Sequence, residues 1–217
     1  MRNFLQHAAW RFLLDQKIDS LPVDPFRIAI QNGWIVYTYE EFAALVHKSV
    51  ESLISRYEKD GFAFWSRRDG RFIICYNAAL PFSVCRWTLL HEMAHIHLQH
   101  INPGTPILSR IRSEDRPLFE REAQGFARRV LCPSIVLHNC KAFEPDQIMR
   151  LCGISREAAD YRSEYIKKLE CRGKFCVDLL EREVEKQFAP FVERYTLQEL
   201  KRWNYDFLFE IAKEISA

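Results

Sequence analysis

The sequence predicts a mainly helical α+β protein with a small antiparallel β-sheet of about three strands and a helical C-terminal extension. Apolar residues recur at helical spacing along most of the chain, which indicates amphipathic helices. Three short segments are instead rich in β-branched and aromatic residues. We expect residues 1–170 to form one domain and residues 171–217 to form the extension, because a chain of 217 residues can bury one substantial core with a small appendage.

The first part of the chain is predicted to combine helices with all of the strands. A glycine, Gly33, follows the second helix at the position where a left-handed C-terminal cap is common. Gly70 ends the turn of a predicted β-hairpin. The expected elements are helices at 3–16 and 26–31, a strand at 34–39, a helix at 40–57, and hairpin strands at 61–65 and 71–76.

The rest of the chain is predicted to be helical. A helix is expected to begin after Pro81 with Ser83 as its N-cap, and to end before Asn102-Pro103-Gly104. The loop from Ile101 to Arg112 contains Pro and Gly and suits the rim of a cleft. Further helices are expected at 118–131, 134–140, 145–152 and 155–170 and over most of 177–217.

Composition excludes several classes of protein. A net charge of +2 gives no reason to expect direct binding of nucleic acid. No apolar run approaches the roughly 18 residues that span a bilayer, so no membrane partner is expected. The N-terminus lacks the apolar core and cleavage site of a signal peptide, so we expect a cytoplasmic protein. Its seven cysteines contain no CxxC pair and are expected to be reduced; a metal clip at Cys171 and Cys176 is a weak alternative.

Residues 91–95, His-Glu-Met-Ala-His, carry the strongest chemical signal. On a helix, His91 and His95 leave the same face about one turn apart, so both ring nitrogens can reach one metal ion. Glu92 projects close enough to meet a metal-bound water without being a ligand. This HExxH pattern is the signature of zinc peptidases when it lies on a helix and a third ligand comes from elsewhere. The alternative is a helix with surface histidines, since His97 and His100 lie nearby.

Four acidic residues are candidates for the third ligand, and spacing alone does not choose among them. Glu114 and Asp115 precede Pro117 and fit the solvated acids of a helix start. Glu122 flanks the apolar stripe formed by Phe119, Ala123, Phe126 and Val130, where a carboxylate is costly unless a charge such as zinc meets it. We therefore favour Glu122. Glu120, on the opposite flank, is the main rival, with an exposed ion pair as its alternative role.

The combination of these motifs resembles the ImmA/IrrE metallopeptidases. His91-Glu-Met-Ala-His95 is followed by Glu122-Ala-Gln-Gly-Phe-Ala127 and then by Val130-Leu-Cys-Pro133, where the family typically shows HExxH, E-A-N-x-F-A and L-M-P. The chain departs from that pattern at Gln124 and Cys132, neither of which is a metal ligand. The resemblance covers about residues 5–165 and implies a zincin-like domain with His91, His95 and Glu122 as zinc ligands and Glu92 as the catalytic base.

The resemblance also implies the substrate class. Members of the family cleave helix-turn-helix repressors of mobile elements or stress regulons, so we expect a bacterial or phage-related zinc endopeptidase that hydrolyses a peptide bond in such a regulator. The hairpin at 61–76 is expected to line the cleft, where an edge strand can pair with an extended peptide. Tyr76, Arg86 and His138 are candidates for stabilising the oxyanion, and the sequence does not choose among them. It also leaves the oligomeric state open.

A different class of function stays open beside proteolysis. Residues 145–168 resemble a helix-turn-helix, with Gly153 in the turn and Ser155 capping the second helix. The alternative is therefore a DNA-binding or scaffold regulator that retains a zincin fold without proteolysis. The second helix carries Glu157 and Asp160 beside Arg156, which is a poor charge balance for contact with phosphates. The presence of Glu92, which catalysis needs and metal binding does not, favours the enzyme.

Overall fold

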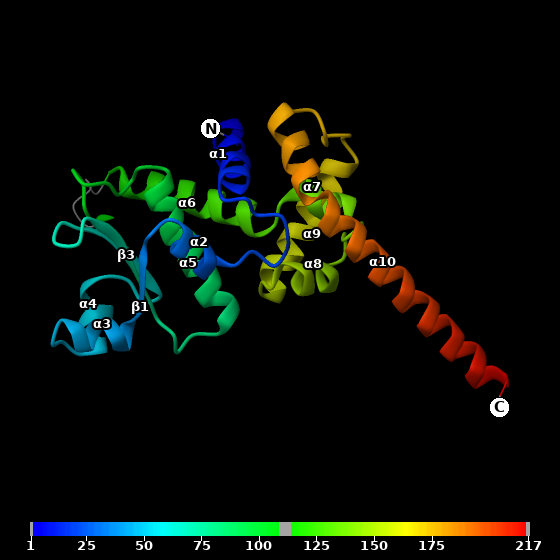
Figure 1. Cartoon of the computed structure of the whole chain (residues 1–217), viewed down its shortest axis with the longest axis horizontal. Helices are drawn as coiled ribbons and strands as arrows, with labels where there is room; N and C mark the ends of the chain where they lie inside the picture. Colours follow the sequence, from blue (N-terminus) through cyan, green and yellow to red (C-terminus); the bar gives the residue numbers. More distant parts are fainter. Residues whose placement is uncertain (1, 109–113, 216–217) are drawn as a thin grey trace.

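A three-stranded sheet in the order β1-β3-β2 occupies one end of the molecule (Figure 1). The computed structural model describes residues 2–108 and 114–215. β3 (Arg71–Tyr76) pairs antiparallel with β2 (Gly61–Ser66) and parallel with β1 (Ile35–Thr38). The sheet is therefore mixed rather than wholly antiparallel as the sequence predicted. The helices between β1 and β2 provide the crossover that a parallel pair requires.

Side chains of β3 alternate between two apolar cores, one on each face of the sheet. Ile74 faces the main core, which contains most of the helices. Ile73 and Cys75 face a smaller core that is completed by Tyr39 and Phe42. Successive side chains of a strand point to opposite faces, so the run of apolar residues in β3 serves both cores.

The helix predicted at 40–57 is interrupted in the structure. α3 (Tyr39–Leu45) begins with a capping box between Thr38 and Glu41, and α4 (Val50–Arg56) begins at Ser49, whose side chain accepts a hydrogen bond from the backbone N–H of Ser52. His47, between the two helices, has a φ of 52°, which ends the helical conformation. The ring of Tyr39 is fully buried and belongs to the smaller core, on one face of the sheet.

Two long helices form the centre of the main core. α5 (Phe82–His97) packs against β2 and β3, and α6 (Arg116–Leu131) packs against α5. α1 (Arg2–Asp15) covers α6, and the rings of Phe12 and Phe126 meet edge to face at 5.2 Å between centroids. The N-cap of α5 is Pro81, without a side-chain hydrogen bond, so the prediction that Ser83 caps this helix is wrong. α5 ends at His97, which agrees with the prediction that this helix ends before Asn102-Pro103-Gly104.

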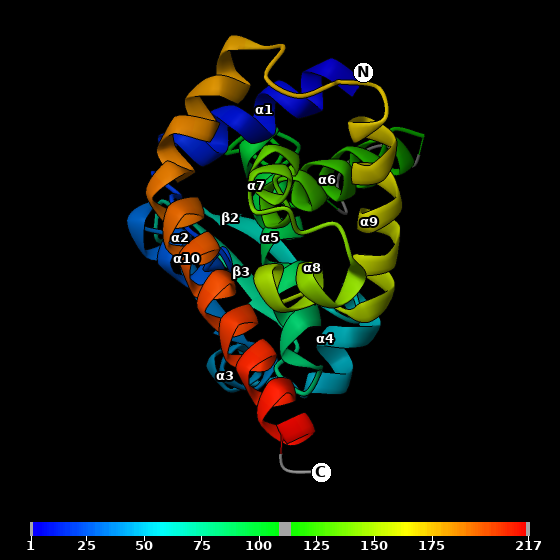
Figure 2. The same ribbon diagram turned by 90° about the vertical axis from the view of Figure 1, so that its right-hand side faces the viewer.

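Apart from the short α2 (Pro25–Gln31), the remaining helices lie on the far side of α5 and α6 from the sheet (Figures 1 and 2). They follow the predicted order closely. Their bounds are α7 (Ser134–Asn139), α8 (Pro145–Cys152), α9 (Arg156–Glu170) and α10 (Leu179–Ile215), and α2 lies next to β1. None of the helices within the described residues is both long and apolar enough to cross a membrane.

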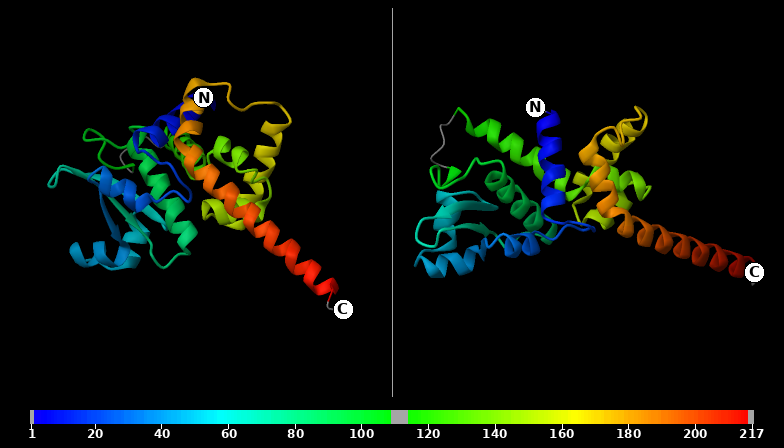
Figure 3. Two further views of the ribbon diagram at one scale, coloured as in Figure 1. Left: turned by 45° about the vertical axis from the view of Figure 1, so that its right-hand side comes forward. Right: turned by 45° about the horizontal axis from the view of Figure 1, so that its top comes forward.

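The first part of α10 belongs to the main core. Val184 and Phe188 are fully buried there, and the side-chain amide of Gln187 donates hydrogen bonds to the backbone oxygens of Leu13 and Ile18 at 2.8 and 2.7 Å. The later part of α10 extends away from the rest of the molecule (Figure 3). The division between residues 170 and 171 stays a prediction, and the packing of Val184 and Phe188 ties the start of the extension to the domain.

Candidate metal centre

α5 holds the two histidines of the HExxH motif on one face. Nε2 of His91 and Nε2 of His95 lie 3.1 Å apart, because residues four apart on a helix are neighbours. His95 is fully buried and His91 is partly exposed to the cleft described below. The two nitrogens therefore converge on one point at the surface of the helix.

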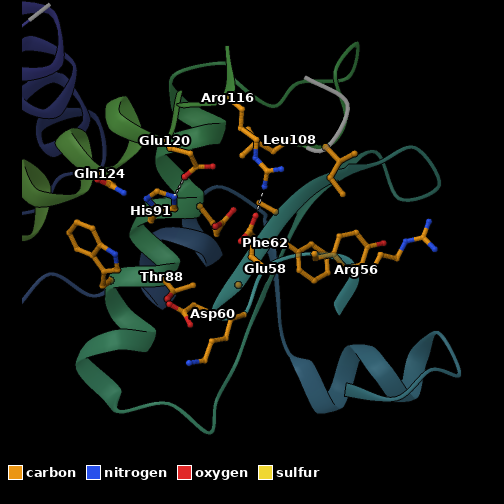
Figure 4. A pocket seen from close by; sticks show the side chains of 17 residues that line it. Arg56, Glu58, Asp60, Phe62, Thr88, His91, Leu108, Arg116, Glu120 and Gln124 are labelled. Atoms are coloured by element: carbon orange, nitrogen blue, oxygen red, sulfur yellow. Dashed lines mark hydrogen bonds and ion pairs between the residues drawn. The ribbon is translucent and has the colours of Figure 1, made fainter. Parts of the chain in front are cut away.

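α6 supplies a carboxylate to the same point. Oε2 of Glu120 lies 3.0 Å from Nε2 of His91 and 3.7 Å from Nε2 of His95 (Figure 4). A tetrahedral zinc ion with bonds of about 2.0–2.1 Å places its ligand atoms roughly 3.3 Å apart. The three measured separations bracket that value, so the donor set and its spacing fit a metal ion such as zinc. Within the described residues, His91, His95 and Glu120 are the one group of this kind.

Glu122, the third ligand favoured from the sequence, does not join this group. Its Oε2 lies 3.1 Å from Nε2 of His100, behind the two histidines of the motif. The structure brings Glu120, and not Glu122, together with the two histidines. The reason is the rotation of α6: residues two apart on a helix point about 200° apart, so only one of the two can face His91 and His95.

His91 and Glu120 shift each other's pKa. Burial lowers the pKa of His91, but the hydrogen bond with Glu120 and the nearby carboxylates outweigh this effect and raise it above the usual value. Burial opposes ionisation of Glu120, yet its hydrogen bonds with His91 and His95 hold the pKa of that carboxyl far below its usual range. Glu120 is therefore ionised at neutral pH and offers a negative charge to a cation.

His100 is held neutral by its surroundings. Burial and the neighbouring His95 lower the pKa of His100 to about 4. In the unfolded chain a histidine has a pKa of about 6.5, so as pH falls from 6.5 towards 4 the unfolded chain takes up a proton that the folded protein does not. The contribution of His100 to folding stability is therefore fully present above about pH 6.5 and is lost as pH falls to about 4.

Glu92 lies beside the group without joining it. The residue is 7% exposed and forms part of the wall of the cleft. Burial raises the pKa of Glu92, against the opposing effects of His95 and His91. A carboxyl whose pKa is raised towards neutrality is suited to accept a proton and release it again.

A cleft of about 690 Å³ opens in front of His91, Glu92 and Glu120 (Figure 4). One wall is the start of β2, from Gly61 to Ala63, together with the segment that precedes it, and the other walls come from α5, α6 and the pair Ile107–Leu108. The start of the predicted hairpin and two residues of the predicted rim loop therefore line the cleft. Residues 109–112 of that loop lie outside the described residues.

The edge of β2 is only partly covered. Phe64 forms an isolated antiparallel bridge with Ile107, and the backbone N–H of Trp65 donates to the oxygen of Pro106 at 2.7 Å. The start of β2, in contrast, lines the cleft. An edge strand of this kind can pair with an extended peptide through main-chain hydrogen bonds.

Two arginines that the sequence did not single out also line the cleft, Arg56 and Arg116. Arg116 pairs with Glu58 across the mouth of the cleft (Figure 4). Arg116 lies at the start of α6, one turn before Glu120. Their distance in sequence from the HExxH motif explains why no pattern pointed to them.

The three residues considered for the oxyanion do not line the cleft. Arg86 is buried and donates to the backbone oxygens of Val23, Cys152 and Gly153. His138 pairs with Glu170, and Tyr76 packs on Phe26. Each therefore has a structural partner away from the metal centre.

The helix-turn-helix-like segment is observed as α8 and α9. Gly153 ends α8 with a φ of 62°, and Ser155 caps α9 as expected. Arg156, the first residue of α9, is engaged by Asp146 at 2.6 Å and by Asp160 at 3.1 Å. Arg162 is buried and donates to the backbone oxygen of Cys132. These two cations are committed to the protein itself.

The cysteines fill the interior rather than form a second metal site. Five of the seven are buried, and all seven are free thiols. Cys171 is exposed, whereas Cys176 donates to Glu185 at 3.2 Å. Among the described residues, this pair belongs to no group of three potential ligands.

Comparison with known proteins agrees with this geometry. Residues 47–164 match the family model Peptidase_M78, described as the IrrE N-terminal-like domain, and the matched segment contains all three residues of the metal-binding group as well as Glu92. A comparison with curated proteins found no match. Because the matched segment spans more than half of the chain and M78 peptidases are metallopeptidases, the protein belongs to the IrrE-like metallopeptidase family.

Proposed function

We propose that the protein is a zinc-dependent endopeptidase that cleaves a regulatory protein of the helix-turn-helix repressor class, in the cytoplasm. The observation that carries the proposal is the convergence of Nε2 of His91, Nε2 of His95 and Oε2 of Glu120 at separations of 3.0–3.7 Å, beside a cleft that His91 and Glu120 line. Two imidazoles and one carboxylate leave a fourth position open, as in catalytic rather than structural zinc sites.

Zinc bound by these three residues would supply Lewis-acid activation of a water molecule and of the substrate carbonyl. Glu92 accepts a proton from the attacking water and delivers it to the nitrogen of the leaving amine. Its burial keeps bulk water from competing for that proton. The free edge at the start of β2 holds the substrate backbone in an extended conformation, so that one peptide bond lies in front of Glu92.

We expect this endopeptidase to have a narrow substrate range. Main-chain pairing to β2 is independent of sequence, so discrimination falls to side-chain contacts along the cleft walls. A folded repressor can present an extended segment only at an exposed loop or linker. We therefore expect one dominant cut in a helix-turn-helix repressor and little digestion of casein.

The decisive experiment compares the wild-type protein with Glu92→Gln at matched zinc content. Glu92→Gln should retain zinc and the fold but lose activity on the repressor by about 10²–10⁴-fold or more, since a general base contributes that much. Glu164→Gln, an exposed carboxylate on α9 that pairs with Lys168, is the matched control and should keep full activity. Proteolysis that survives Glu92→Gln would refute the assignment of the base, and extensive casein digestion would refute the narrow specificity.

A further inference from the structure

A chain of buried polar side chains continues behind the metal-binding group. Nδ1 of His95 lies 3.0 Å from Nδ1 of His100, and Nε2 of His100 lies 3.1 Å from Oε2 of Glu122. The side chains of His95 and His100 are 1% and 4% exposed, and that of Glu122 is 17% exposed. We refer to these three residues as the support triad.

Hydrogen-bond geometry allows one consistent arrangement of protons in the support triad. His95 can bind a cation through Nε2 only with the lone pair of that atom, so the proton of its neutral ring must lie on Nδ1. That proton is donated to Nδ1 of His100, which must therefore be an acceptor. The proton of His100 then lies on Nε2 and is donated to Glu122. Each of the three groups is satisfied, and the tautomer of His95 is the one that presents its lone pair to the metal.

Local structure holds His100 in this orientation. Gln99, at a φ of 62°, turns the chain back after α5, and the backbone N–H of Ile101 donates to the oxygen of His95 at 3.1 Å. The ring of His100 stacks on Phe119 of α6, with 4.3 Å between centroids and an interplanar angle of 10°. The ring is therefore fixed from both sides, once by the backbone turn and once by an aromatic face.

The other histidine of the motif lacks such support. Nδ1 of His91 is buried and has no hydrogen-bond partner among the described residues. The two histidines differ in this respect although they lie one turn apart on the same helix. α6 and the turn after α5 therefore fix the orientation of His95, and they do not fix that of His91.

We propose that His100 and Glu122 are positioning residues of the metal centre: they fix the tautomer and ring orientation of His95 and thereby raise the affinity for the catalytic metal. This inference rests on the proposed function. α6 then contributes two glutamates with different tasks, Glu120 to bind the metal directly and Glu122 to act through His100. Outer partners of this kind typically account for about 10–100-fold in metal affinity.

The test measures zinc affinity by competition with a chromophoric chelator and uses four variants. His100→Phe keeps the stacking on Phe119 but removes both nitrogens, and Glu122→Leu removes the acceptor. Each should weaken zinc binding by about 10–100-fold. The double variant should lose no more than the worse of the two single variants, because each single change already breaks the same chain. Glu122→Gln retains an acceptor oxygen and should restore most of the affinity.

A spectroscopic readout separates positioning from a purely structural role. With Co²⁺ in place of zinc, the visible d–d bands of His100→Phe and Glu122→Leu should shift, because the ligand geometry at His95 changes. His97→Phe is the matched control: His97 also lies on α5 but packs on Phe12 and Phe126 outside the triad, so its zinc affinity and Co²⁺ spectrum should be unchanged.

Three results would overturn the inference. The first is wild-type zinc affinity and Co²⁺ spectra in the variants together with a lower melting temperature of the metal-free protein, which would assign the triad to folding alone. The second is additive losses of zinc affinity in the double variant. The third is a wild-type protein that binds no zinc, which would overturn the proposed function as well. If His100→Phe does not fold, the comparison of Glu122→Leu with Glu122→Gln still decides the question. A failure confined to the triad leaves wild-type zinc binding intact.

Discussion

Replacement of Glu120 by Gln isolates the contribution of the proposed third ligand. The substitution preserves the size of the side chain and removes the negative charge that faces Nε2 of His91 at 3.0 Å. A direct ligand should matter more than an outer partner, whose loss costs about 10–100-fold in metal affinity. We therefore expect Glu120→Gln to weaken zinc binding by more than about 100-fold, which corresponds to about 2.7 kcal/mol.

This loss can be read as a change in thermal stability. Zinc at a free concentration of about 1,000 times the wild-type Kd stabilises the folded protein by about 4.1 kcal/mol. At the same concentration, a 100-fold weaker site contributes only about 1.4 kcal/mol. For a chain of this size 1 kcal/mol shifts Tm by about 2–4 °C, so the rise in Tm on adding zinc should be smaller by about 5–11 °C in Glu120→Gln.

The assay is differential scanning calorimetry with and without zinc, with zinc content measured after dialysis. Glu114→Gln is the matched control, because Glu114 is an exposed acid shortly before α6 and lies outside the cleft wall. It should show the wild-type response. A Glu122→Gln variant that loses more zinc than Glu120→Gln would refute the choice of ligand made from the structure.

Three further predictions test the cleft, the buried histidine and the alternative function. A Cβ at Gly61 would lie 2.4 Å from Cγ2 of Thr88 and 2.8 Å from a backbone oxygen, so Gly61→Ala should lower the free energy of unfolding by about 1–3 kcal/mol. Adding Thr88→Ser, which removes Cγ2, should restore part of this loss. An unchanged midpoint of urea unfolding in Gly61→Ala would contradict the prediction. In the metal-free protein, the free energy of unfolding of the wild type should fall relative to that of His100→Phe as pH falls from 6.5 to 4, by at most about 3 kcal/mol. Chemical denaturation measures this difference, and a difference that does not change with pH would disprove the prediction. Duplex DNA should not bind appreciably at physiological salt, because Arg156 is engaged by two carboxylates; a sequence-selective gel shift that Arg156→Ala abolishes would favour the regulator instead.

Most of the helices could be predicted because their sequence signals are local. The caps at Thr38 and Ser155 and the left-handed glycines at 33 and 153 mark boundaries within one turn of the residues that they affect. The HExxH motif is likewise local, since one helical turn brings His91 and His95 together wherever the helix lies. The sequence was therefore sufficient to predict that the side chains of the two histidines lie together.

Features that depend on how distant segments meet were harder to predict. The parallel pairing of β1 with β3 joins residues far apart in the chain, and no turn specifies its direction. The break between α3 and α4 occurs at His47, which carries no glycine or proline signal. The ion pair between Glu58 and Arg116 likewise connects two elements whose distance only the folded chain determines.

The position of Glu120, the proposed third ligand, lies between these two cases, and the sequence held a signal that points to it. At about 100° per residue, the stripe formed by Phe119, Ala123, Phe126 and Val130 is centred closer to Glu122 than to Glu120. The structure shows that Ala127 and Leu131 are also buried, at 0% and 1% exposure, while Phe119 is only partly buried. Including those two residues and leaving out Phe119 rotates the centre of the buried face towards Glu120 by about 40°. Glu120 then lies about 50° from the centre and Glu122 more than 100° away on the other flank. This rotation of α6 brings Glu120 within reach of the two histidines and leaves Glu122 for His100.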